Sequence, residues 1–289
     1  MFPPGRLRRD TAESGLQVRL TGGFRRSLVG KRSRLLLSLV ALFLLPLVSP
    51  VAAEDWKWSV DIGAERADVS ISGHDAVWWT ERFQLTYRNE AKGGAWLQLE
   101  NQSREENTDT TVHAGGYWRL GAWTLLGQVG VTPNADFNYK FLGEAEVSRR
   151  LVGTLVGQLG YRYLEYPGTT VHLFSPALTL YLPRGELQAK GFIGRGTDFE
   201  PKAAVVMVRG VWDVTQTLRL HAGLSVGEGI FGVTQGVFGT GELPDGWVAF
   251  VNPEVRLTSK DTIGGAFIRG HEEPRFEKRS LGVYYRRVF

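Results

Sequence analysis

Apolar and polar residues alternate along most of the chain, beginning near residue 56. In the first segment Trp58, Val60 and Ile62 share one parity, and Lys57 and Asp61 lie between them. Because successive side chains of a β-strand point to opposite faces, this period of two predicts a strand with one apolar and one polar face. The pattern predicts strands over 56–66, 77–88, 95–103, 110–120, 123–132, 139–150, 154–165, 170–182, 186–195, 203–213, 217–227, 247–258, 262–269 and 279–289.

The two faces of these strands favour a membrane protein over a soluble sandwich. The apolar faces are rich in large aromatic and aliphatic residues, while the polar faces carry many charges. The connections also alternate, with short turns such as 120–122 and 183–185 between longer segments such as 67–76, 104–109 and 228–246. Short periplasmic turns, longer outer loops and an even strand number are typical of outer-membrane barrels. We therefore predict an all-β, antiparallel transmembrane β-barrel of about 14 strands, or of 12 if 95–103 and 262–269 are not strands.

The N-terminal part of the chain has the pattern of an export signal. Lys31, Arg32 and Arg34 precede an apolar run over 35–48, and small residues follow as far as Ala53. This run contains a proline and is shorter than the ~20 apolar residues that a spanning helix needs. We expect residues 1–53 to be an N-terminal extension and secretory signal peptide, and residues 54–289 to be the barrel.

Composition excludes several classes of protein. Residues 1–53 hold nine Lys and Arg against two Asp and Glu, so residues 54–289 hold 25 basic and 28 acidic residues, a net charge of −3. The basic character of the whole chain therefore lies in its first segment and does not indicate a nucleic-acid partner. The chain has no cysteine, which excludes disulfides and thiolate metal ligands. We expect no cofactor and no metal site.

Three stretches resemble one family. Their sequences are TPNADF at 132–137, GYRY at 160–163 and HLFSPALTLYLP at 172–183. These stretches resemble the YaiO family of outer membrane β-barrel proteins, over roughly residue 56 to the end. The resemblance implies a barrel in the outer membrane of a Gram-negative envelope, and it implies no established activity.

The C-terminal strand resembles the general ending of outer-membrane proteins. Tyr285 and the terminal Phe289 fit the alternating pattern, whereas Arg287 occupies a position that is usually apolar. In proteins of this type the last strand is recognised by the barrel-insertion machinery. We therefore expect this machinery to be a partner and Tyr285 and Phe289 to be its signal.

Aromatic residues cluster near both ends of the predicted strands. Tyr and Trp settle at the headgroup level of a membrane, where one side of the ring is apolar and the other is wet. The predicted periplasmic belt contains Trp56, Tyr87, Trp118, Trp123, Trp212 and Phe289, and the predicted outer belt contains Trp79, Tyr139, Tyr163 and Trp247.

Charged residues of both signs face the inside of the predicted barrel. Two interpretations are open. In the first, these residues line a narrow aqueous pore whose arginines bind carboxylates or phosphates. In the second, they pair across the strands and only stabilise the barrel. The segment 228–246 either folds into this lumen as a gate or continues as hairpin strands above the membrane. The predicted lumen-lining residues are Arg82, Glu100, Arg119, Glu144, Arg162, Lys190, Arg209, Arg219, His221, Glu254 and Arg286.

The leading functional hypothesis is a porin-like passive channel, or an accessory for the passage or secretion of a polar or saccharide solute. The alternative is a non-conducting structural or surface-interaction barrel in contact with outer-membrane lipid. A lipid-modifying enzyme ranks third and we expect no catalytic residues. His172 and Ser175 are three apart and face opposite sides, and His221 and Ser225 are ~13 Å apart on one strand.

Overall fold

The computed structural model describes residues 56–196, 203–228, 245–273 and 276–289. The predicted signal peptide at 1–53 and most of the segment 228–246 lie outside these residues. No helix in the described part is long and apolar enough to cross a membrane. The described residues form fourteen strands, which are β1 (Lys57–Ile71), β2 (His74–Asn89), β3 (Gly93–Arg104), β4 (Asn107–Leu120), β5 (Trp123–Val131), β6 (Phe141–Val152), β7 (Leu155–Tyr166), β8 (Thr169–Leu182), β9 (Gly185–Gly196), β10 (Ala203–Asp213), β11 (Leu218–Glu228), β12 (Asp245–Arg256), β13 (Asp261–Glu272) and β14 (Phe276–Val288).

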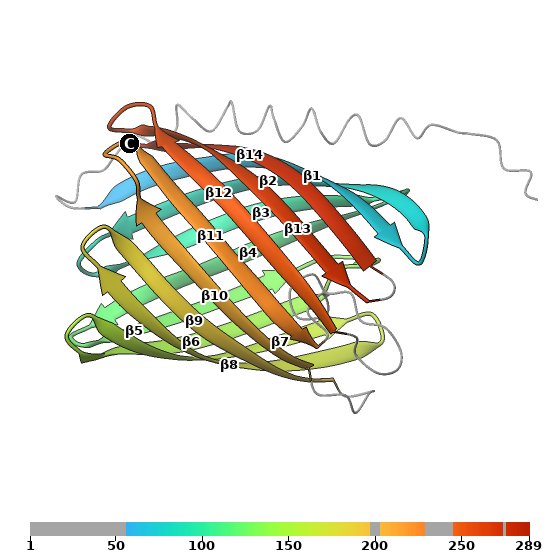
Figure 1. Cartoon of the computed structure of the whole chain (residues 1–289), viewed down its shortest axis with the longest axis horizontal. Helices are drawn as coiled ribbons and strands as arrows, with labels where there is room; N and C mark the ends of the chain where they lie inside the picture. The colour runs from blue at the N-terminus through green and yellow to red at the C-terminus, as the bar shows by residue number, and fades with distance from the viewer. Residues whose placement is uncertain (1–55, 197–202, 229–244, 274–275) are drawn as a thin grey trace, which may run out of the picture. The chain divides into compact units, whose positions relative to one another are not determined.

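The strands close into one antiparallel barrel (Figure 1). Each strand pairs with its neighbours along the chain, and β1 pairs with β14 from Ser59–Val288 to Ile71–Phe276. The prediction of a 14-strand antiparallel barrel is confirmed. The 12-strand alternative is wrong, because β3 and β13 are complete strands that pair on both sides.

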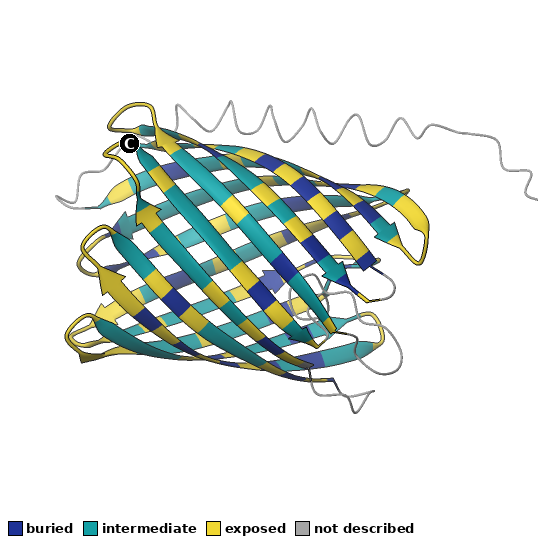
Figure 2. Cartoon of the chain, viewed as in Figure 1, coloured by how far each residue is buried: buried dark blue, intermediate teal, exposed yellow. Residues whose placement is uncertain are grey.

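Exposed and less exposed side chains alternate along several strands, most regularly along β8 and β14 (Figure 2). In β11 the apolar Leu224 and Val226 are 48% and 47% exposed on the outer surface, whereas Ser225 between them is buried. Val208 of β10 is the cross-strand partner of Leu224, and Ala189 of β9 connects Val208 to Leu178 of β8, so these residues all lie on the same outward face. The barrel therefore presents an apolar outer surface and encloses most of its polar residues.

The observed connections between strands differ from the predicted ones at only one end of the barrel. The short turns 121–122, 153–154 and 183–184 lie at the end that holds Lys57 and Val288, which we call the periplasmic end. At the opposite, outer end, three predicted loops are instead two-residue turns at 72–73, 105–106 and 167–168.

The predicted outer loops were too long because the strands continue beyond the region of strict apolar alternation. Once a strand rises above the hydrocarbon, its outward positions no longer need to be apolar, and the sequence pattern fades. Turn chemistry supports the longer hairpins. Ser72 and Gly73 both have positive φ, 51° and 83°, as the two-residue hairpin turn of type I′ requires. Gly168 has φ 100° and follows a proline, as in a type II turn.

The aromatic residues mostly lie where the belts predict. Trp118, Trp123 and Trp212 are 58%, 44% and 47% exposed on the outer surface near the periplasmic end. Trp56 stacks on Tyr87 at the same end, with ring centroids 4.7 Å apart. Figure 1 shows the C-terminus at this end as well.

Tyr139 does not belong to the outer belt, and its assignment was wrong. It precedes β6, which begins at Phe141 and not at residue 139. Its hydroxyl lies 3.0 Å from Nε2 of His113, a residue on the inward face of β4, so the ring points into the barrel.

Arg287 shows how a cation is accommodated in the C-terminal strand. Its guanidinium lies 3.5 Å from the Asp261 carboxylate and 5.7 Å from the centre of the Phe289 ring. Tyr285 also donates a hydrogen bond to Asp261. The charge is thus paired at the periplasmic rim, where a lipid-facing cation is tolerated best.

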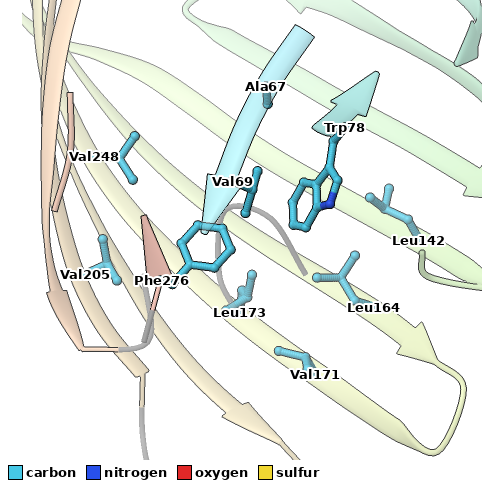
Figure 3. Packing of buried hydrophobic residues seen from close by; sticks show 10 residues of the cluster. All are labelled: Ala67, Val69, Trp78, Leu142, Leu164, Val171, Leu173, Val205, Val248 and Phe276. Atoms are coloured by element: carbon cyan, nitrogen blue, oxygen red, sulfur yellow. The ribbon is translucent and has the colours of Figure 1, made fainter. Parts of the chain in front are cut away.

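A buried apolar cluster lies inside the barrel at its outer end (Figure 3). Its members are inward-facing residues near the outer ends of eight strands, each between 1% and 8% exposed. Trp78 of β2 and Phe276 of β14 are in contact with ring centroids 6.0 Å apart. We call this group the apolar closure, and it consists of Ala67, Val69, Trp78, Leu142, Leu164, Val171, Leu173, Val205, Val248 and Phe276.

The outward face predicts how charge affects stability. In the register Trp212 is the partner of Leu220, and Trp247 is the partner of Val226. Leu224 of β11 therefore lies between the levels of these two tryptophans. Leu224→Arg should lower the free energy of unfolding by about 2–4 kcal/mol, and Leu218→Arg, near the periplasmic end, by about 0–1 kcal/mol. Urea unfolding of the two variants in lipid vesicles measures the difference. Equal losses would contradict the placement of this face in the membrane.

Candidate functional site

The register places all eleven predicted lumen residues on inward faces. One ion pair demonstrates this directly, because Nζ of Lys190 on β9 lies 3.0 Å from Oε2 of Glu146 on β6. Two strands separate β6 from β9 in the wall, so these side chains meet inside the barrel. The inward residues are Arg82, Glu100, Arg119, Glu144, Arg162, Lys190, Arg209, Arg219, His221, Glu254 and Arg286.

Most of the predicted arginines bind carboxylates across neighbouring strands. Arg82 lies 2.8 Å from Glu100, and Arg162 lies 2.8 Å from Glu144. Both glutamates are mostly buried and accept further hydrogen bonds from glutamine amides, including Gln128 at 2.6 Å from Glu144. These pairs occupy the middle of the wall, where each arginine has its charge balanced within the protein.

A second network centres on Glu254, near the periplasmic end. The Glu254 carboxylate lies 3.5 Å from His221 and 3.9 Å from Arg286, and it accepts a hydrogen bond from the hydroxyl of Tyr284. The Tyr284 ring lies against Gly264, where a Cβ would be 2.2 Å from the ring. Any larger residue at 264 would therefore displace Tyr284 from this network.

The rim of the lumen at the periplasmic end has an excess of basic residues. The inward-facing acidic residues there are paired, as Asp213 is with Arg219 at 2.6 Å. Arg119 donates to the carbonyl oxygen of Glu90. Among the described residues, no carboxylate lies within ion-pair distance of the remaining bases. We call this group the basic mouth, and it consists of Lys57, Arg88, Arg119, Arg150 and Arg256.

A polar cavity of about 180 Å³ lies directly below the apolar closure. Its walls include Trp78, Leu142 and Leu164 of the closure as well as Glu100 and Arg162. A second cavity of about 220 Å³ lies beside Asp61, Arg82 and Arg286 along β1, β2 and β14. The lumen therefore changes from charged to apolar toward the outer end.

The connection 132–140 is anchored inside the outer end by Asp109. The Asp109 carboxylate is 1% exposed and accepts hydrogen bonds from the backbone N–H groups of Asp136, Phe137 and Asn138 at 3.0, 3.1 and 2.7 Å. The Thr111 hydroxyl contacts this connection as well. The stretch at 132–137 that resembles the family therefore forms a connection held by a buried anion.

Arg104 joins this connection to the apolar closure. Its guanidinium stacks 4.2 Å from the centre of the Trp78 ring and 4.4 Å from the centre of the Phe137 ring. Burial raises the pKa of the nearby Tyr139 phenol above its ordinary value, so the hydroxyl remains neutral at physiological pH. Lys278 pairs with Glu65 at 3.3 Å on the same side of the lumen.

Sequence reasoning missed Arg104, Asp109 and Lys278 because it placed all three in loops or at loop boundaries. The signal that could have found them is the continuation of inward parity, from Glu100 to Arg104 and from Ser280 back to Lys278. Parity alone does not reveal the three hydrogen bonds that Asp109 accepts from the connection 132–140.

The inward-facing side chains are buried near the outer end of the barrel and more exposed near the periplasmic end. The apolar closure and Asp109 are at most 8% exposed. Nearer the periplasmic end, the side chains of Arg209 and Arg219 are 43% and 44% exposed. A closed 14-strand barrel with an apolar outer surface and a charged lumen defines an outer-membrane β-barrel protein.

Comparison with protein families agrees with this class. Residues 57–227 match the YaiO membrane beta barrel domain, so the chain belongs to the YaiO family. The predicted family and the predicted location in the outer membrane are confirmed. No curated protein matches the chain.

The chain is similar to solved structures of outer-membrane proteins. OmpT of Vibrio cholerae, from the outer membrane, is 9% identical, with 83% of this chain and 100% of that chain covered and a TM-score of 0.50. The translocator domain of autotransporter NalP from Neisseria meningitidis is 10% identical, covers 90% of this chain and 97% of its own, and has a TM-score of 0.43. At this identity the likeness to OmpT concerns the fold alone.

The candidate catalytic pairs are not assembled in the described residues. His172 faces outward, and its Nδ1 forms a hydrogen bond of 2.6 Å with the hydroxyl of Tyr161. Ser175, in contrast, is buried on the inward face. His221 is directed to Glu254. Within the described ranges, no group of three or more His, Cys, Asp or Glu residues is arranged to hold a metal ion.

The Lys190–Glu146 pair should contribute to stability. Its two side chains are 13% and 15% exposed, so Glu146→Gln leaves a poorly hydrated cation and should lower the free energy of unfolding by about 3 kcal/mol. Asp68→Asn breaks the exposed pair with Arg66 and should lower it by at most about 1 kcal/mol. Adding Lys190→Met to Glu146→Gln should restore most of the loss. Urea unfolding measures all three, and equal effects of the two single variants would contradict the role of the inner pair.

Proposed function

We propose that this YaiO-family barrel is a gated channel for a polar, anionic solute that enters from the periplasmic end. The single observation that carries the proposal is the division of the lumen. A basic mouth leads to a charged interior, and the apolar closure then seals the outer end. An apolar constriction of this kind blocks ions by excluding water, and it conducts only when its walls separate.

The basic mouth supports the choice of an anionic solute. Its five bases have no carboxylate within ion-pair distance in the described part of the chain, while the inward-facing Asp213 and Glu254 nearby already have partners. Unpaired guanidinium groups bind carboxylates and phosphates through parallel hydrogen bonds, and they raise the local concentration of anions. A saccharide that carries such groups fits this requirement, and so does a small organic acid.

The connection 132–140 is the element we assign to gating. It lies against the closure through Arg104, Trp78 and Phe137, and Asp109 holds it through three backbone hydrogen bonds. Releasing those bonds would free one side of the closure without touching the wall. The segment 228–246, which the sequence also suggested as a gate, lies outside the described residues apart from its ends.

A non-conducting structural or surface-interaction barrel is the second candidate. The observation that favours it is the pairing of Arg82, Arg162, Arg219 and Arg286 with carboxylates, since these arginines were the predicted anion path. Under this hypothesis the ion pairs and the closure serve stability alone. We propose that the chain is not an enzyme, in accord with the separation of His172 from Ser175, and that the insertion machinery recognises its last strand.

The role of Asp109 predicts a change in conductance. Asp109→Ala removes the acceptor of three N–H groups, so it should raise the open probability at least tenfold in planar bilayers. Asp136→Ala is the matched control, because it removes an exposed carboxylate from the same connection. Silent bilayers for both variants, with folded and heat-modifiable protein, would favour the non-conducting barrel.

The basic mouth predicts ion selectivity. In the Asp109→Ala background, Arg150→Ala combined with Arg256→Ala should shift the reversal potential in a salt gradient away from anion preference. Arg162→Ala combined with Glu144→Ala should have a smaller effect on selectivity, because it removes a balanced pair and leaves the net charge of the lumen unchanged. An unchanged reversal potential in the mouth variant would contradict anion entry through this rim.

A further inference from the structure

A pair of arginines lies on the outward face near the outer end, away from the lumen. Arg269 of β13 and Arg279 of β14 are direct cross-strand partners, and both side chains point away from the barrel interior. Outward residues on the periplasmic side of this pair are Phe267 and Leu281, which are 53% and 55% exposed. The two arginines therefore lie at the outer boundary of the apolar surface.

The charges of this pair are not balanced within the described protein. Like charges directly opposite each other on adjacent strands are destabilising. In the described residues no carboxylate lies within ion-pair distance of Arg269 or Arg279. Asp68 is opposite Arg279 in the register, but its carboxylate bonds Arg66 at 2.8 Å. The arrangement would be relieved by an anion that both guanidinium groups contact.

The surface around the pair is hollow and has an aromatic wall. A depression of about 250 Å³ is lined by Trp247, Arg269, His271, Glu277 and Arg279, among others. The Arg269 guanidinium lies 5.9 Å from the centre of the Trp247 ring, and His271 is held 3.7 Å from Glu277. Tryptophan at this level is typical of the boundary between acyl chains and headgroups. The hollow thus has a lipid-facing side below and a cationic side above.

We propose that Arg269, Arg279 and Trp247 form a binding site for a phosphorylated lipid headgroup of the outer leaflet. The two guanidinium groups bind one phosphate, the indole contacts the sugar or glycerol backbone, and the acyl chains lie along Phe267 and Leu281. A free phosphate would share the guanidinium contacts but would leave the apolar side of the hollow unused. This site is independent of the proposed channel, because Arg269, Arg279 and Trp247 all face away from the lumen.

The chain offers a matched control at the opposite end of the same surface. Arg149 of β6 faces outward and its guanidinium lies 4.8 Å from the centre of the Trp123 ring. It reproduces the arginine–tryptophan contact at the periplasmic level, without a second arginine opposite to it. Arg149→Gln therefore removes one outward charge and leaves the proposed site intact.

The test measures lipid retention by native mass spectrometry. Protein purified from outer membranes is stripped of lipid in mild detergent and titrated with diphosphoryl lipid A, or with an acyl-matched lipid that has no phosphate. We expect the native protein to bind the phosphorylated lipid at least tenfold more tightly. The double variant Arg269→Gln/Arg279→Gln should lose this preference, and Arg149→Gln should keep it.

Each other outcome overturns the proposal. An unchanged preference in the double variant would show that the phosphate binds elsewhere. An equal loss of this preference in Arg149→Gln would show that binding depends only on the net charge of the protein. Displacement of the lipid by millimolar inorganic phosphate would assign the site to free phosphate. All substituted residues are at the surface, and heat-modifiable migration in gels verifies that each variant is folded.

Discussion

The pairing of β1 with β14 is the constraint on which the rest of the structure depends. In hydrocarbon every backbone N–H and C=O group needs a partner within the protein, so an open sheet edge is not tolerated. The register from Ser59–Val288 to Ile71–Phe276 removes the last two edges. Closure also fixes parity, because a shift of one strand by one residue would turn the charged lumen residues of that strand toward lipid. The apolar outer surface and the charged lumen are therefore two consequences of one hydrogen-bond ladder.

Enclosing so many charges creates a second requirement, which the lumen meets differently at each level. In the middle, arginines and glutamates of neighbouring strands pair, as Arg162 and Glu144 do at 2.8 Å. At the outer end, charge gives way to the apolar closure and to Asp109, whose carboxylate is satisfied by backbone N–H groups. At the periplasmic rim, bases remain unpaired where water reaches them. The lumen thus changes from unpaired bases at the periplasmic rim, through balanced ion pairs, to buried apolar side chains at the outer end.

Period-two alternation predicted the strand number and the inward direction of the eleven lumen residues, because the direction of a side chain follows from the pleat of a single strand. It failed where that constraint is relaxed. At the end of β1 after Arg66 the apolar residues lie on the inward face and the outward residues are polar, so the lipid-facing pattern ends there and a tight hairpin was predicted to be a loop. The partners of the lumen residues also escaped prediction. The Lys190–Glu146 contact crosses two intervening strands, and the anchoring by Asp109 depends on the path of the connection 132–140. Such contacts depend on barrel closure and have no local signature.

The central claim is that the outer end of the lumen is sealed by apolar side chains while the lower lumen is hydrated. The most direct measurement is a crystal structure of the protein at a resolution that shows ordered water. The account predicts water around Arg286, Glu254 and the basic mouth, and a dry contact between Trp78, Phe276 and Leu173. A continuous column of water through the closure would contradict it.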